Sequence, residues 1–126
     1  MHPVFLLLSA ISALLAVAMG AFGAHALKTV LSPEMLAVYK TAVNYQMWHA
    51  LGLGFIALLR QQNPEARLLI YAGWLMFAGI VLFSGSLYLL SFSGVKWLGM
   101  ITPFGGLSFL GAWLLVVIFA FKACKA

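Results

Sequence analysis

Two histidines and several hydroxyl side chains are the residues of this sequence that could do chemistry. Tyr45 and His49 are four residues apart, so they share one face if their segment is helical. Five further polar residues come from other uncharged segments: His25, Ser84, Ser86, Tyr88 and Thr102. An imidazole titrates near neutral pH, and hydroxyl groups both donate and accept hydrogen bonds. We therefore predict that these seven residues form a ligand-binding set.

The same residues do not make a catalytic signature. Ser84 and Ser86 have no nearby acidic residue that could complete a triad, and Glu34 and Glu65 are expected at opposite membrane faces. The sequence contains neither HExxH nor CxxC, and its single cysteine, Cys124, cannot form an internal disulfide. We expect no enzyme activity, no catalytic residue, no metal site and no cofactor.

The composition decides the class of protein. The chain has 126 residues, of which 65% are apolar and 7% are charged. A soluble domain carries about 25% charged residues and less than half apolar ones. A disordered chain needs low hydrophobicity and high charge. Both classes are therefore excluded, and a small membrane protein remains.

Four apolar stretches are long enough to cross a bilayer, which requires about 20 residues in a helix. They are Val4 to Leu27, Thr41 to Leu59, Leu68 to Val95, and Trp97 to Cys124 apart from Lys122. A β-barrel would need alternating polar and apolar residues, which these stretches lack. Short turns force successive helices to run in opposite directions. The sequence predicts an all-α membrane protein, with four transmembrane helices in an up-down-up-down bundle and residues 1–126 in a single domain.

The second helix is expected to begin before its apolar stretch. Ser32, Pro33 and Glu34 give a hydroxyl N-cap, a proline at the first helical position and an acid near the positive end of the helix dipole. A helix from there to Arg60 is longer than one crossing requires. We interpret its first turns as an amphipathic entry at the membrane surface.

Alternating helix direction should bring the polar residues to one half of the bilayer. At 1.5 Å per residue, His49, Tyr88, Ser84 and Thr102 lie roughly 10, 9, 15 and 8 Å from the face opposite the chain termini. Ionisable groups inside a membrane are costly and usually face the bundle interior. The structural alternative is that these groups only tie helices together by hydrogen bonds, and the sequence leaves both readings open.

Lysine and arginine residues in short loops indicate orientation. Arg60, Arg67, Lys122 and Lys125 lie on the side of the termini, whereas Lys28, Lys40 and Lys96 lie on the other side. This small difference favours cytoplasmic termini in a bacterial inner membrane and leaves insertion in both orientations open. The sequence contains no basic stripe for phosphates, so no nucleic-acid partner is expected.

The sequence also resembles a known family along nearly its full length. The matching segments are Gly20 to His25, Thr41 to Tyr45 with His49 to Leu51, Phe83 to Ser86 with Tyr88 and Leu89, and Gly99 to Pro103 with Gly105, Gly106 and Gly111 to Trp113. In order and spacing they resemble the YgdD/YwdK-like family of small bacterial inner-membrane proteins. The resemblance implies a four-helix inner-membrane protein and supplies no activity, cofactor or catalytic residue.

Three functional hypotheses follow. The first is a binding or scaffolding protein for a membrane partner or lipid, or for a second copy of the chain. The second is a small permease or proton-linked carrier that uses the polar cluster in the non-cytoplasmic half. The third, much weaker, is a haem or metal site with His25 and His49 as axial ligands.

Overall fold

The computed structural model describes residues 3–125, and in this part of the chain the regular structure is entirely helical. The elements are α1 (Val4–His25), α2 (Pro33–Gln62), α3 (Arg67–Gly79), the π-helical η1 (Ile80–Ser84), α4 (Gly85–Ser93), the 3-10 helix η2 (Lys96–Met100) and α5 (Thr102–Lys125). Because α3, η1 and α4 follow one another without a break, the elements form four long rods.

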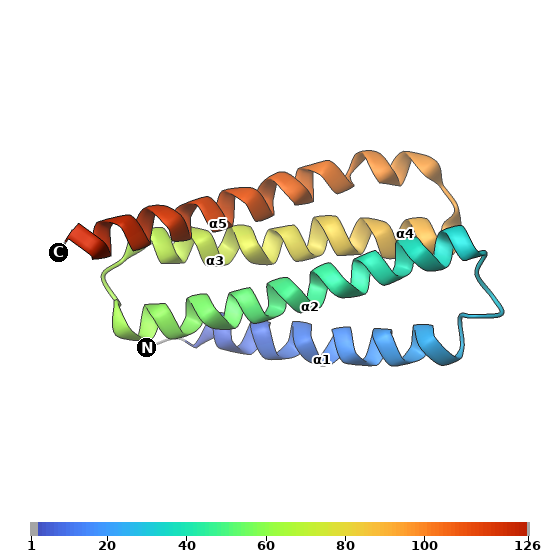
Figure 1. Ribbon diagram of the computed structural model, residues 1–126, viewed down its shortest axis with the longest axis horizontal. Helices are drawn as coiled ribbons and strands as arrows, with labels where there is room; N and C mark the ends of the chain where they lie inside the picture. The colour runs from blue at the N-terminus through green and yellow to red at the C-terminus, as the bar shows by residue number, and fades with distance from the viewer. Residues whose placement is uncertain (1–2, 126) are drawn as a thin grey trace.

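The rods lie side by side, and the chain reverses direction between them (Figure 1). α2 packs against α1 on one side and against α3, η1 and α4 on the other, while α5 packs against α3 and η1. Both chain ends and the turn at residues 63–66 lie at one end of the molecule, which we call the terminal end. The loops at residues 26–32 and 94–101 lie at the opposite end.

Local sequence signals explain the start of α2 and the end of α4. The Ser32 hydroxyl accepts a hydrogen bond from the Met35 backbone N–H at 3.2 Å, so the predicted N-cap of α2 is confirmed. Gly94 ends α4 with φ of 70°, a left-handed conformation that glycine adopts without steric cost. The fourth apolar stretch does not run as one helix from Trp97, because residues 96–100 form η2 and α5 starts at Thr102.

Three of the rods are apolar and long enough to cross a membrane by themselves: Val4–His25, Arg67–Ser93 and Lys96–Lys125. α2 has the length but does not meet the same measure of hydropathy. Its sequence includes charged Lys40 and Arg60 and the polar residues Asn44, Gln46 and His49. The prediction of an all-helical membrane-type chain is therefore confirmed, while the composition of α2 alone does not define a fourth span.

The apolar core lies mainly toward the terminal end. Phe5, Leu53, Leu69, Met76 and Phe109 are all less than 5% exposed and belong to one cluster. Two glycines allow aromatic rings to pack directly against the α3 backbone. An added Cβ at Gly73 would collide with the Phe5 ring, and one at Gly79 would collide with the Phe109 ring. Close packing of this kind replaces the hydrophobic driving force that helices lack inside lipid.

The approach of α5 to η1 is the closest backbone contact that a glycine permits here. A Cβ on Gly105 would meet the backbone of Phe83, whereas a Cβ on Gly85 would meet nothing within 4 Å. Gly105→Ala should lower the free energy of unfolding by about 1–3 kcal/mol, as overpacking usually does. Gly85→Ala should leave it unchanged or raise it by up to about 1 kcal/mol, because alanine favours the helix.

Both variants can be compared by titrating the purified protein with dodecyl sulfate in mixed micelles and following the circular dichroism. Equal stability of the two variants would show that α5 does not approach η1 this closely.

Candidate functional site

A buried glutamine connects three helices in the half of the molecule toward the opposite end. The Gln46 side-chain N–H (Nε2) of α2 donates to the carbonyl oxygen of Ser12 on α1 at 2.9 Å. Its oxygen Oε1 accepts a hydrogen bond from the Tyr88 hydroxyl of α4 at 2.6 Å. Gln46 is 6% exposed, so its amide is engaged inside the protein. Tyr88 was a predicted site residue, but Gln46 was not.

Tyr39 continues this network toward the opposite end. Its ring is 1% exposed and packs edge-on against the Tyr88 ring, with the centroids 5.4 Å apart. Its hydroxyl donates to the carbonyl oxygen of Met19 on α1. Gly23 makes room for the ring, because any Cβ at that position would collide with Tyr39. Tyr39 therefore ties the start of α2 to α1, although the sequence analysis treated this stretch as a surface entry.

Tyr45 and His49 share one face of α2, as predicted, and that face contacts η1 and α5. The two rings stack with centroids 5.9 Å apart, and His49 also lies flat on Phe109, at 3.5 Å between centroids. Phe83 packs against Tyr45 at 4.5 Å. His49 is 7% exposed, so aromatic side chains enclose most of its imidazole.

The single hydrogen bond of the His49 side chain determines its tautomer. Nδ1 lies 2.8 Å from the carbonyl oxygen of Tyr45, which can only accept, so Nδ1 carries the proton and donates. In the neutral ring, Nε2 then has the free lone pair. His49 is sixteen residues from Pro33 and thirteen from Gln62, near the middle of α2.

The remaining predicted site residues form separate ties or stand alone. The Ser84 hydroxyl donates to the Ala42 carbonyl oxygen at 2.7 Å, which joins η1 to α2. Ser86 and Thr102 share a hydrogen bond of 2.7 Å between α4 and the start of α5. His25 ends α1 and is exposed, and its side chain makes no hydrogen bond among residues 3–125. Among the predicted residues, the structure thus pairs Tyr45 with His49 and Ser86 with Thr102, whereas Ser84 and Tyr88 bond to Ala42 and Gln46.

These hydrogen bonds tie neighbouring helices to one another. The donors of Gln46, Tyr88 and Ser84 are each directed at an oxygen on another helix. Within residues 3–125, no group of three or more His, Cys, Asp or Glu side chains is placed to hold a metal ion. His25 and His49 belong to different levels of the fold, which removes the geometric basis for a pair of axial ligands.

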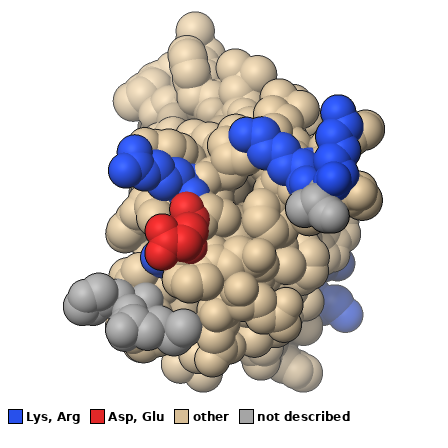
Figure 2. Space-filling view, turned by 90° about the vertical axis from the view of Figure 1, so that its left-hand side faces the viewer, with Lys and Arg blue, Asp and Glu red and all other residues tan. Residues whose placement is uncertain are grey.

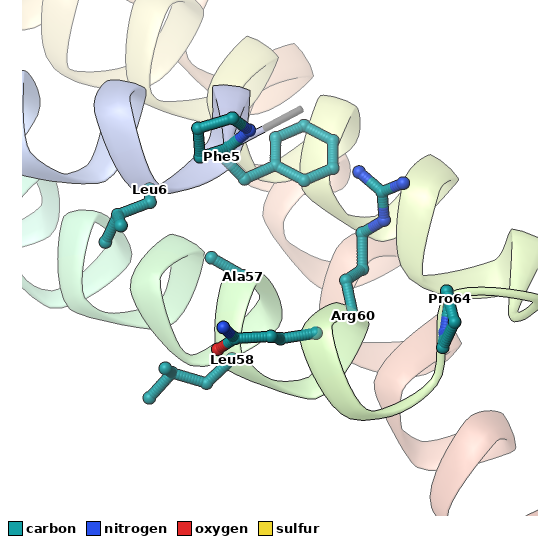
Figure 3. A pocket seen from close by; sticks show the side chains of 8 residues that line it. Phe5, Leu6, Ala57, Leu58, Arg60 and Pro64 are labelled. Atoms are coloured by element: carbon teal, nitrogen blue, oxygen red, sulfur yellow. The ribbon is translucent and has the colours of Figure 1, made fainter. Parts of the chain in front are cut away.

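Hollows in the surface occur at the terminal end. The first has a volume of about 390 Å³ and is lined by Pro3, Phe5, Leu6, Ala57, Leu58, Arg60, Gln61 and Pro64 (Figure 3). Two shallower ones flank the turn between α2 and α3. The seven predicted site residues line none of these three hollows. Sequence reasoning treated Arg60 only as a topology signal and missed that it borders a cavity.

Long apolar helices with an internally paired set of polar side chains define a helical membrane protein. A family model described as "Protein of unknown function (DUF423)" matches residues 19–106. The chain therefore belongs to this family of membrane proteins of unknown function, which confirms the resemblance seen in the sequence.

The relatives are similar along almost their whole length. The chain is 51% identical to UPF0382 membrane protein YwdK of Bacillus subtilis over 119 residues, which cover 94% of this chain and 97% of the relative. It is 45% identical to UPF0382 membrane protein SH2409 of Staphylococcus haemolyticus over 118 residues, covering 94% and 95%. No solved structure matches the chain.

The Gln46 bridge can be tested by a double-mutant cycle. Gln46→Leu leaves the Tyr88 hydroxyl without its acceptor, and each orphaned buried polar group costs about 1–3 kcal/mol. Tyr88→Phe alone leaves Oε1 unpaired. The double variant should therefore be less destabilised than the sum of the single variants, by about 0.6 kcal/mol or more.

The measurement is the free energy of unfolding in mixed micelles for all four proteins. Ser93→Ala with Gln46→Leu serves as the control cycle, because Ser93 is exposed and bonds only within its own region of the chain. Strict additivity of Gln46→Leu and Tyr88→Phe would argue against the bridge.

Proposed function

We propose that this chain is a multi-pass protein of the bacterial inner membrane that binds a lipid or a membrane-protein partner and has no catalytic activity. Four transmembrane helices run up, down, up and down, and residues 1–126 form one domain. The observation that carries the proposal is that three interior polar side chains, those of Gln46, Ser84 and Ser86, hydrogen-bond to other helices. Binding is then left to the outer surface and the ends.

The position of α2 supports a fourth crossing. α2 is packed between α1 and the rod formed by α3, η1 and α4, and its ends lie near theirs (Figure 1). If those neighbours cross the membrane, α2 crosses with them. The polar side chains that lower its hydropathy point partly inward, since Gln46 and His49 are both less than 8% exposed. A buried, paired polar group costs much less in a membrane than one facing lipid.

The outer surface supports binding within the membrane. On α1, Leu7, Leu14 and Val17 are each more than half exposed, and the same holds for Phe104, Leu107 and Leu110 on α5. Such faces are solvated by lipid chains, and they also suit contact with another helix or with a second copy of the chain. A proton-linked carrier is less well supported, because aromatic side chains surround His49 and it lines none of the three hollows.

Charge supports cytoplasmic termini. The terminal end carries Arg60, Arg67, Lys122 and Lys125, and Figure 2 shows basic side chains on both sides of this end with one acidic patch next to those on the left. Lys28, Lys40 and Lys96 belong to the other half. The positive-inside rule then directs the terminal end to the cytoplasm.

The natural single cysteine offers a test of this orientation. Cys124 is free and exposed at the end of α5. In intact spheroplasts, a membrane-impermeant maleimide should fail to label Cys124 and should label it fully after permeabilisation. As a matched control, Thr29→Cys in a Cys124→Ser background should be labelled in intact spheroplasts, since Thr29 is exposed in the loop after α1. Labelling of Cys124 from outside would contradict the proposed orientation, and partial labelling of both sites would indicate insertion in both directions.

The binding function is tested by extracting the tagged chain from bacterial membranes in copolymer nanodiscs, which retain neighbouring lipid. We expect either a stoichiometric protein partner or a lipid composition distinct from that of the bulk membrane. An unrelated four-helix membrane protein of similar size, extracted in parallel, supplies the background. A chain recovered alone with bulk lipid composition would reject the proposal.

A further inference from the structure

The hollow at the terminal end combines apolar walls with one cation. Leu6 of α1 and Leu58 of α2 are 53% and 59% exposed and open the hollow toward the side of the molecule. The Phe5 ring closes it toward the core, and the Arg60 guanidinium lies over that ring at 5.4 Å (Figure 3). A volume of about 390 Å³ is within the range of roughly 300–1,000 Å³ found for small-molecule sites.

Arg60 is left without a counter-charge in this part of the structure. Its Nε is buried, and among residues 3–125 it has no hydrogen-bond partner. Neither Glu34 nor Glu65 forms an ion pair with it in the described structure, and Glu34 belongs to the opposite end of α2. A buried donor without an acceptor costs free energy unless an outside group satisfies it. The group that does so most strongly is an anion with several oxygens, such as a phosphate.

The position of Arg60 along α2 indicates whether that phosphate belongs to a phospholipid or is a free ion. Arg60 is two residues before the end of α2, so it lies roughly 3 Å from the polar turn that follows. The apolar wall formed by Leu6, Ala57 and Leu58 runs from there toward the middle of the bundle. A phosphate at the guanidinium therefore has a hydrocarbon groove directly below it, which matches a phospholipid and not a free ion.

We propose that this hollow binds one anionic phospholipid, with its phosphate on Arg60 and the upper part of an acyl chain between α1 and α2. The excess of basic residues around this end favours an anionic over a zwitterionic headgroup. This inference rests on the proposed binding function, because it names lipid as the ligand.

Trp74 provides a local reporter. Its ring packs edge-on against Phe5 at 5.2 Å between centroids, and it is 49% exposed. With Trp48, Trp97 and Trp113 changed to Phe, Trp74 fluorescence should be quenched about fivefold more effectively by dibrominated phosphatidylglycerol than by dibrominated phosphatidylcholine, in bilayers that mix each with its unbrominated form. This factor is what one cation typically contributes to binding at an anionic membrane surface.

Charge variants assign the preference to Arg60. Arg60→Gln should reduce the ratio of quenching by the phosphatidylglycerol to quenching by the phosphatidylcholine to near one. Arg60→Lys should give an intermediate ratio, and Arg67→Gln should leave the ratio close to its original value. Arg67 is the matched control because it is exposed at the same end and does not line this hollow. If Arg67→Gln lost the preference for the anionic lipid as fully as Arg60→Gln, general surface charge would explain the preference and the proposal would be overturned.

A second measurement does not depend on the tryptophan changes. Native mass spectrometry of the unmodified chain, presented with equal amounts of the two lipids, should retain one phosphatidylglycerol in preference, and Arg60→Gln should not. Displacement of that lipid by inorganic phosphate at constant ionic strength would mean that the site recognises free phosphate. Equal and weak quenching by both brominated lipids would mean that something other than lipid fills the hollow.

The outcomes separate this inference from the proposed function. A protein partner captured from membranes together with a quenching ratio of one would remove the lipid assignment and leave the binding function standing. Failure of both tests would remove both.

Discussion

The structure depends on pairing buried polar groups with hydrogen-bond partners inside the protein. The Gln46 amide meets this requirement by joining three helices, α1, α2 and α4. In lipid, an unpaired buried N–H or C=O costs several kcal/mol, so the groups must pair within the protein. Gln46 donates to α1 and accepts from α4 while belonging to α2. A rotation of α2 about its axis would break both bonds together. The amide therefore fixes the rotational setting of a helix whose apolar side chains would permit several.

Serine hydroxyl groups also form hydrogen bonds between helices, and these bonds require the two backbones to be close together. Ser9 donates to the Ala50 carbonyl oxygen at 2.7 Å, and Ser108 donates to that of Leu75 at 2.6 Å. A serine side chain reaches a neighbouring helix only if the two backbones are close, and small residues permit that approach. Gly54 faces the Ser9 hydroxyl in this way. Small residues at the helix contacts therefore make the interhelical hydrogen bonds of the serines possible.

The four helical rods could be predicted because long uncharged runs interrupted by short polar turns have few alternatives. The pairing of Tyr45 with His49 followed from helical spacing. The roles of Gln46 and Tyr39 did not, because both depend on which side of α2 faces α1 and α4. α2 carries apolar residues all round, so its periodicity does not define that side. The π-helical turn at residues 80–84, which packs against α2 and α5, was also not predicted, since no local sequence signal marks it.

The division of the molecule into two ends explains why a ligand is expected at one of them. Toward the opposite end, Tyr39, Gln46 and Tyr88 pair with groups on neighbouring helices and leave their polar atoms engaged. At the terminal end, the core side chains of Phe5, Leu69 and Met76 offer no acceptor for a cation, yet Arg60 of α2 lies over the ring of Phe5 of α1. The Arg60 guanidinium lies against an aromatic ring, and its Nε is the one buried side-chain nitrogen or oxygen in the described structure without a hydrogen-bond partner. A physical reason to keep arginine there is an acceptor that the chain itself does not supply, and at this level of a membrane protein the abundant acceptor is the lipid phosphate.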